Sequence, residues 1–176
     1  MQTKQSMAVH FSSETPEHYT PPAIINAVLA VLGSIDLDPC SNSRERPNVP
    51  ARIHFTKDDD GLSQFWFGRV YCNPPYGREI GAWVDAITRY YDQGLITEAI
   101  MLVPARTDTQ WWKWLTLHSA MFCFVEGRLC FVGNNDPAPF PSALVYFGPN
   151  AGKFYDVFNR VGMVCKIVTQ DEARAA

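Results

Sequence analysis

The chain has 176 residues, 47% of them hydrophobic and 13% aromatic, and its formal net charge is -3 at pH 7. This composition excludes a disordered chain and predicts a single domain over residues 1–176, with residues 1–13 as a loose arm. A net negative charge argues against a nonspecific nucleic-acid coat, so contact with DNA requires a local basic patch. No apolar run approaches the ~20 residues that span a bilayer, and the first residues lack the apolar stretch of a signal peptide. We therefore expect a soluble, cytoplasmic protein.

Five cysteines are scattered along the chain without a C-x-x-C pair, and no histidine is spaced to complete a zinc site. We expect free thiols and no metal.

Helix and strand patterns alternate along the first half of the chain. After Pro22, apolar residues recur at helical spacing, Thr20 is available as a cap and Gly33 ends the run, so a helix of about three turns is expected. The next patterns predict a strand at 35–38, a loop at 40–50, a weak strand at 52–55, an acidic turn at 57–61 and a strand at 69–72.

The second half continues the alternation. An amphipathic pattern predicts a helix at 80–91, and the continuous apolar run 99–103 is typical of a strand covered by helices on both faces. The remaining patterns predict a helix at 109–117, strands at 121–125, 143–147 and 163–169, and a short helix at 155–159. Together they predict an α/β fold, with an open, mostly parallel sheet, helices on both faces and antiparallel strands at one edge.

Asn73, Pro74, Pro75 and Tyr76 directly follow the apolar strand at 69–72. In open α/β sheets ligands bind at this end of a strand. An amine conjugated to a purine is a poor nucleophile, because its lone pair is delocalised. The Asn73 side-chain oxygen and the Pro74 carbonyl can accept its two N–H groups from a stiff turn, and Tyr76 can stack on the base. Such a pocket needs a flipped or single-stranded base; the alternative is a plain strand-ending loop.

This Asn-Pro-Pro-Tyr turn resembles the catalytic motif of amino-methyltransferases, most of which modify adenine N6. With segments that match in the expected order over about residues 14–148, the chain resembles the phage-type DNA N6-adenine methyltransferase (Dam-like) family. The further matching segments are 19–22, 37–41, 59–62, 103–107, 127–129 and 138–142. The resemblance implies a Rossmann-like methyltransferase fold. It also implies methyl transfer from S-adenosylmethionine to adenine in DNA, with S-adenosylhomocysteine as the product and no metal.

The resemblance further implies a cofactor site built from the Thr-Pro-Pro segment, the first sheet motif, the acidic turn and the catalytic motif. A solvated turn is the alternative for the acidic residues. Residues 40–44 lack the glycines usual in the first motif, and the stretch between the first and catalytic strands is short, so a trimmed sheet is expected there. The residues assigned to the cofactor are Thr20, Pro21, Asp38, Pro39, Cys40, Asp59, Asp60 and Asn73.

Basic and aromatic residues that follow strands on the same side are candidates for DNA contact. A small patch of arginines there would contact phosphates, although an ordinary surface role is the alternative. Trp111, Trp112 and Trp114 fit a core role better than base stacking. The residues assigned to DNA are Tyr76, Arg106, Arg128, Phe140 and Ser142.

The sequence thus predicts an adenine-specific DNA methyltransferase with a short or relaxed recognition site, because no room remains for a recognition domain. We expect a bacterial host cell, phage or prophage origin, a role in DNA methylation or restriction-modification, and a homodimer that widens the footprint. Two alternatives stay open. One is a protein-glutamine N5 methyltransferase, since such motifs hold any planar amide, and the other is a non-catalytic module that binds cofactor or DNA.

Overall fold

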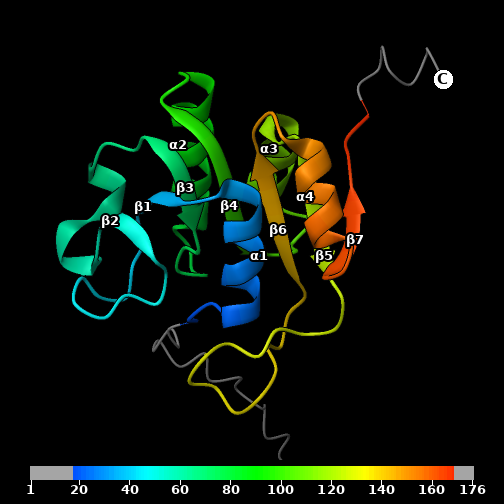
Figure 1. Cartoon of the computed structure of the whole chain (residues 1–176), viewed down its shortest axis with the longest axis horizontal. Coiled ribbons are helices and arrows are strands. Elements are labelled where there is room, and N and C mark those ends of the chain that lie inside the picture. Colours follow the sequence, from blue (N-terminus) through cyan, green and yellow to red (C-terminus); the bar gives the residue numbers. More distant parts are fainter. Residues whose placement is uncertain (1–17, 169–176) are drawn as a thin grey trace, which may run out of the picture.

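The computed structural model of the chain describes residues 18–168 (Figure 1). Within them, seven strands form one sheet, which packs against four α-helices. The arm expected at residues 1–13 lies outside the described residues. The helices are α1 (Pro22–Leu32), α2 (Ile80–Asp92), α3 (Gln110–His118) and α4 (Ala151–Phe158). The strands are β1 (Ile35–Asp38), β2 (Ala51–His54), β3 (Gly68–Cys72), β4 (Ile96–Pro104), β5 (Met121–Val125), β6 (Ser142–Phe147) and β7 (Gly162–Cys165).

The strands lie in the order β2-β1-β3-β4-β6-β5-β7. Strands β2, β1, β3 and β4 pair in parallel, whereas the pairs β4–β6, β6–β5 and β5–β7 are antiparallel. Strands β6 and β7 therefore run against the other five. The expected open sheet with antiparallel strands toward one edge is confirmed.

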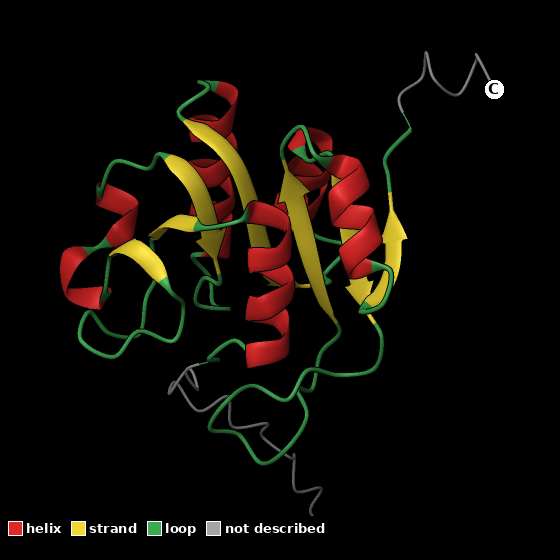
Figure 2. Ribbon diagram, viewed as in Figure 1, coloured by secondary structure: helices red, strands yellow, loops and turns green. Residues whose placement is uncertain are grey.

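The helices cover both faces of the sheet (Figure 2). Helices α1 and α4 pack on one face, where Ile100 and Leu102 of β4 point, and α2 and α3 pack on the other, where Met101 and Val103 point. Both faces of β4 are therefore buried, which explains its continuous apolar sequence. No helix within residues 18–168 has the length and apolar character needed to cross a membrane.

The stretch between β1 and β3 is short. It holds β2 and two single-turn 3-10 helices, η1 (Lys57–Asp59) and η2 (Gly61–Ser63), and no α-helix. The expected trimming of the sheet at this place is confirmed. As a consequence, the acidic turn lies directly against the end of β1.

Several expected boundaries need correction. Thr20 does not cap α1: the N-cap is Pro21, because the Thr20 hydroxyl turns inward to the Tyr71 hydroxyl. Gly33 does end the helix, with a positive φ of 77°. Helix α4 begins at Ala151, four residues before the expected start, and β7 ends at Cys165 rather than 169, a residue outside the described range.

Candidate active site

The predicted catalytic motif lies where β3 leaves the sheet. Strands β1 and β4 flank β3 in parallel, so the ends at Asp38, Cys72 and Pro104 lie along one edge of the sheet. Pro74 is buried and Pro75 is exposed, while Asn73 and Tyr76 are half-buried. The start of α1 and the loop 126–141 lie at the same edge, where Tyr19 pairs with Val132 (Figure 1).

The side-chain amide of Asn73 is held by the segment that precedes α1. Its Nδ2 donates to the His18 carbonyl at 2.6 Å and to the Thr20 hydroxyl at 3.1 Å. Thr20, only 1% exposed, also hydrogen-bonds the buried Tyr71 hydroxyl at 2.8 Å. Since both amide hydrogens are engaged, the orientation that places nitrogen toward α1 and oxygen away from it is fixed.

The Asn73 oxygen faces Tyr76. The Tyr76 hydroxyl donates to Asn73 Oδ1 at 2.7 Å, and burial raises the pKa of Tyr76 well above its ordinary value, so it stays a donor. An amide oxygen has two lone pairs, so Asn73 Oδ1 keeps one for a further donor. Among the described residues, none donates to the Pro74 carbonyl.

Tyr76 belongs to a cluster of four aromatic rings with His18, Phe131 and Phe140. The His18 ring lies 5.1 Å from Tyr76, 4.7 Å from Phe131 and 5.7 Å from Phe140, measured between centroids. Within the described part of the chain, its Nδ1 is buried without a hydrogen-bond partner, and burial lowers the pKa of His18. The imidazole is therefore neutral at physiological pH.

Asp38, at the end of β1, is a buried acid. Its side chain is 3% exposed, and Oδ1 accepts from the Cys40 backbone N–H at 3.3 Å. Burial raises its pKa to about 6, against smaller opposing effects of Cys40, Ser41 and His54. A buried carboxylate with few donors has spare acceptor capacity, which suits a positively charged or N–H-bearing ligand.

The backbone of Pro39 contacts the backbone of the acidic turn at Gly61. A Cβ built on Gly61 would lie 1.9 Å from the Pro39 carbonyl oxygen, so only glycine permits this approach. The Gly61 carbonyl in turn accepts from the Trp66 indole N–H at 2.7 Å. The glycine that this edge requires therefore lies in the acidic turn, while the first motif itself has none.

The two acidic residues assigned to the cofactor differ. Asp59 accepts from the backbone N–H and the hydroxyl of Thr56 and pairs with Arg44, and these contacts, led by the Thr56 backbone, lower its pKa. Asp60 is exposed, and its backbone has the left-handed conformation, with φ of 50°. Its backbone carbonyl accepts from the backbone N–H and the hydroxyl of Ser63. Asp59 thus stabilises the turn, and the carboxylate of Asp60 is the one left facing solvent.

The sulfur atoms of Cys40 and Cys72 lie 3.7 Å apart between β1 and β3. Burial raises the pKa of the Cys40 thiol well above its ordinary value, so it is protonated and contributes packing. All five cysteines are free thiols, as expected. Among residues 18–168, no group of three or more His, Cys, Asp or Glu side chains is arranged to hold a metal ion.

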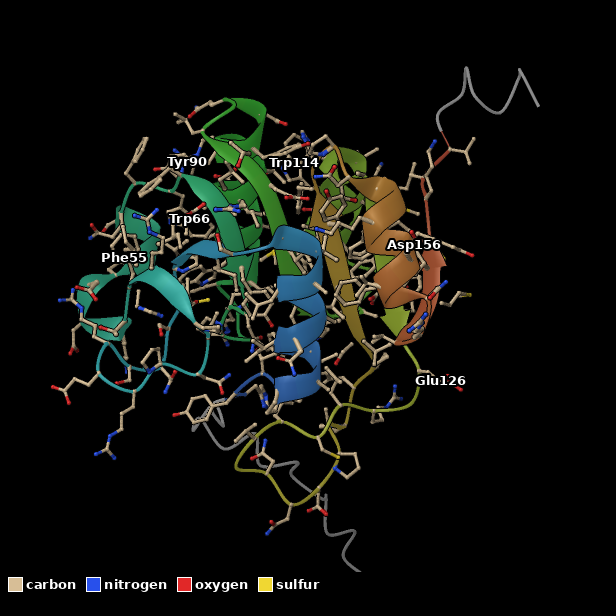
Figure 3. The ribbon with its side chains drawn as sticks, in the orientation of Figure 1. Phe55, Trp66, Tyr90, Trp114, Glu126 and Asp156 are labelled. Atoms are coloured by element: carbon tan, nitrogen blue, oxygen red, sulfur yellow. The ribbon has the colours of Figure 1, made fainter. Side chains whose placement is uncertain are left out.

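The residues assigned to DNA differ in exposure. Arg106 and Arg128 are exposed, Phe140 is half-buried against Tyr76, and Ser142 pairs with Pro104 and is buried. Trp114 is remote from this group: its indole donates to Thr88, and Figure 3 shows it at the opposite end of the molecule from Glu126, where the loop 126–141 begins.

Three contributors to this edge were not identified from the sequence. They are His18, the hydroxyl of Tyr71 and Phe131. His18 directly precedes the Tyr-Thr-Pro-Pro segment and Phe131 follows Gly-Arg-Leu, so both adjoin segments that were singled out. Their spacing carries no chemical signal, because they meet Asn73 and Tyr76 only through the tertiary fold.

An open sheet in which β6 lies antiparallel between β4 and β5, with an Asn-Pro-Pro-Tyr turn ending β3, defines a Rossmann-like methyltransferase. Residues 11–142, which are 132 of the 176, match the sequence model of the family described as DNA N-6-adenine-methyltransferase (Dam). The chain therefore belongs to this family, whose members are adenine N6-methyltransferases.

Among solved structures, the chain is similar to the 23S rRNA methyltransferase ErmE, at 13% identity and a TM-score of 0.47 over 75% of this chain and 70% of that chain. A search of curated protein sequences gives no significant match.

Proposed function

We propose that this chain transfers a methyl group from S-adenosylmethionine to the N6 amine of an adenine in DNA. One observation carries the proposal beyond family membership: the amide of Asn73 is anchored at the end of β3 by His18 and Thr20, with its oxygen turned away from them. An oxygen that is already fixed orients an incoming amine without reorganisation of the protein. Preorganised polar groups of this kind contribute strongly to transition-state stabilisation in enzymes.

Asn73 and Pro74 divide the binding of the amine between them. The remaining lone pair of Asn73 Oδ1 accepts one N–H, and the Pro74 carbonyl accepts the other. These two hydrogen bonds hold the amine in a geometry in which the nitrogen lone pair is no longer conjugated with the ring. Tyr76 keeps Asn73 Oδ1 in place through its hydroxyl and presents its ring to the base.

The residues at the β1 end fit the cofactor. S-adenosylmethionine supplies the reactive methyl group on a positively charged sulfur, and the protein supplies position and electrostatics. Asp38 would accept from the cofactor ammonium or stabilise its charge, because its buried carboxylate has spare acceptor capacity. Asp60 would face the ribose hydroxyls, while Thr20, Pro21, Pro39, Cys40 and Asp59 shape the surrounding backbone.

The DNA-binding side is proposed to include Arg106, Arg128, Phe140 and Ser142. Because each discriminating base contact is worth ~1–3 kcal/mol, these few side chains support a short or relaxed site. We further propose a single-domain enzyme that acts on DNA in a bacterial cell, with phage-type origin, and that a homodimer widens its footprint.

Methyl transfer is tested with purified protein, labelled S-adenosylmethionine and unmethylated DNA. We expect label in N6-methyladenine after digestion to nucleosides, and sequencing of the methylated DNA should return a short site. A defined site of six or more bases from a monomer contradicts the specificity proposal. Label in glutamine of a protein substrate, and none in DNA, contradicts the DNA proposal and favours the protein-glutamine alternative.

A further inference from the structure

The ring of His18 occupies the centre of the aromatic cluster beside the catalytic amide. It is tilted by 33° to the Tyr76 ring and by 35° to the Phe131 ring, while Phe140 meets it edge-on at 75°. Around it, Tyr76, Phe131 and Phe140 are 5.4–6.5 Å from one another. These three rings form a box that holds one planar heterocycle.

The His18 ring lies where the adenine amine must lie in order to be methylated. Tyr76 packs against the His18 ring at a tilt of 33° and simultaneously donates to Asn73 Oδ1, the acceptor assigned to the amine. A planar ring held against Tyr76 therefore lies next to the catalytic oxygen. The base cannot stack on this face of Tyr76 while the imidazole is there.

The backbone of His18 is fixed, whereas its ring is weakly held. The His18 carbonyl accepts from Asn73, and the next residue pairs with Val132, which donates to the Tyr19 carbonyl at 2.9 Å. The ring is only half-buried, and its Nδ1 lacks a partner among the described residues. A buried nitrogen without a partner is unfavourable, and rotation of the ring into water would give it one.

We propose that the space filled by the His18 ring is the site of the flipped target base, and that the base enters by displacing this ring into solvent and takes its place against Phe131. The inference rests on the proposed function and names the substrate pocket of the same site. Aromatic stacking in the box supplies affinity for the base. Asn73 and Pro74 accept from the exocyclic amine, and they therefore favour adenine over thymine, which has no such amine.

Displacement is tested by NMR on the histidine Cε1–H signals, with S-adenosylhomocysteine present to prevent turnover. In the free protein, three neighbouring rings shift the His18 signal, which the His18→Ala variant identifies. Adding single-stranded oligodeoxyadenylate should move this signal to the position of an exposed histidine, while oligothymidylate of equal length should not. Binding of each oligonucleotide is followed by fluorescence anisotropy, and His118, remote from the box, serves as the internal reference.

Kinetics give an independent readout. His18→Ala should lower KM for DNA several-fold, because the base no longer competes with a ring. Phe131→Leu should raise KM about tenfold, in line with the loss of one stacking contact. Phe158→Leu, equally buried in the α1–α4 layer but remote from the box, controls for general loss of packing: it should lower Tm without changing KM.

The outcomes separate this inference from the proposed function. If DNA is methylated and oligodeoxyadenylate binds, but the His18 signal stays in place and His18→Ala raises KM, then His18 is a fixed wall and the displacement is wrong. If neither oligonucleotide binds and no DNA is methylated, the proposed function fails and this inference fails with it.

Discussion

The ends of β1 and β3 lie on one edge of the sheet, yet their polar side chains are satisfied in opposite ways. Asn73, at the end of β3, is fixed by His18, Thr20 and Tyr76 at 2.6–3.1 Å. Asp38, at the end of β1, is almost fully buried and receives one backbone N–H at 3.3 Å. The β3 end is preorganised by the protein, whereas the β1 end is left for a ligand to complete.

This difference predicts which substitutions affect the rate and which affect binding. A group that is fixed in advance contributes to the transition state, so its loss lowers kcat. A buried polar group that is unsatisfied in the free protein contributes to ground-state binding of a ligand. Its loss therefore raises the dissociation constant of that ligand, while the free protein becomes more stable.

The largest effect is expected for Asn73→Ala. Loss of a preorganised acceptor typically costs about 10²-fold or more in kcat, whereas the affinity for S-adenosylmethionine should change little. Initial rates with labelled cofactor and isothermal titration measure the two quantities. Asn159→Ala, on the exposed end of α4, is the matched control. Near-normal turnover by Asn73→Ala would contradict the role of the amide.

Thr20→Val tests the support of Asn73. The substitution keeps shape but removes the hydroxyl that bonds both Asn73 and Tyr71. We expect kcat to fall about tenfold and the free energy of unfolding by ~1–2 kcal/mol. Thr20→Ser restores the hydroxyl and should recover most of kcat, a rescue that a purely packing role of Thr20 would not give.

Asp38→Asn tests the opposite behaviour of the β1 end. The dissociation constant for S-adenosylmethionine should rise about tenfold, the usual scale for one charge-assisted contact, with a smaller change in rate at saturating cofactor. The pattern is measured by titration and by rates at high cofactor. A fall in kcat at unchanged affinity would remove Asp38 from the cofactor site.

The pH dependence of stability follows from the same carboxyl. Because the pKa of Asp38 rises from its ordinary 3.8 to about 6 on folding, the folded state binds the proton more tightly. Its contribution makes the free energy of unfolding greater below pH 4 than above pH 6, with a change of up to ~3 kcal/mol between them. Asp38→Asn should be more stable than the parent at pH 7 and lose this dependence, as denaturant titrations at several pH values would show. Cofactor affinity should weaken as pH falls through about 6.

Gly61→Ala tests the close approach that brings the acidic turn to β1. The added methyl group meets the Pro39 carbonyl, so the free energy of unfolding should fall by ~1–3 kcal/mol and the cofactor should bind more weakly. Gly152→Ala, in α4 with open space around its Cβ position, is the control and should be neutral or slightly stabilising. Equal melting temperatures for the two variants would contradict the contact.

The smallest effects belong to the exposed arginines. Arg106→Ala and Arg128→Ala should each raise KM for DNA a few-fold at low salt. Each should also reduce the slope of log Kd against log salt by the amount that corresponds to about one phosphate contact. The slope of log Kd against log salt measures this. An unchanged slope in both variants would place the DNA elsewhere on the surface.

The sequence was sufficient for the order of elements and for the strand that delivers Asn73, because hydrophobic periodicity and turn residues are local signals. The family resemblance also assigned Asp38 and the acidic turn to one cofactor site, which stays a prediction. The sequence did not show that Asp59 is occupied by Thr56 and Arg44, since that depends on the conformation of the turn. Nor did the sequence show that the Thr20 hydroxyl bonds Tyr71 and Asn73 and does not cap α1.

The contacts of His18 and Phe131 could not be read from the chain at all. They lie more than 100 residues apart and meet because the loop 126–141 returns to the start of α1. Neither residue lies in a recognisable motif, and both resemble ordinary packing residues in a sequence. Tertiary geometry alone places them at the catalytic motif.

Residues 19 and 20 join three loops to which the proposed function assigns the cofactor, the target amine and the DNA. The Thr20 carbonyl accepts from Asn48 in the loop after β1, its hydroxyl accepts from Asn73, and the Tyr19 carbonyl accepts from Val132 in the loop 126–141. A ligand that restrains one loop should therefore also restrain the others. Cofactor and DNA should then bind cooperatively, and by thermodynamic linkage each must tighten the other by the same factor.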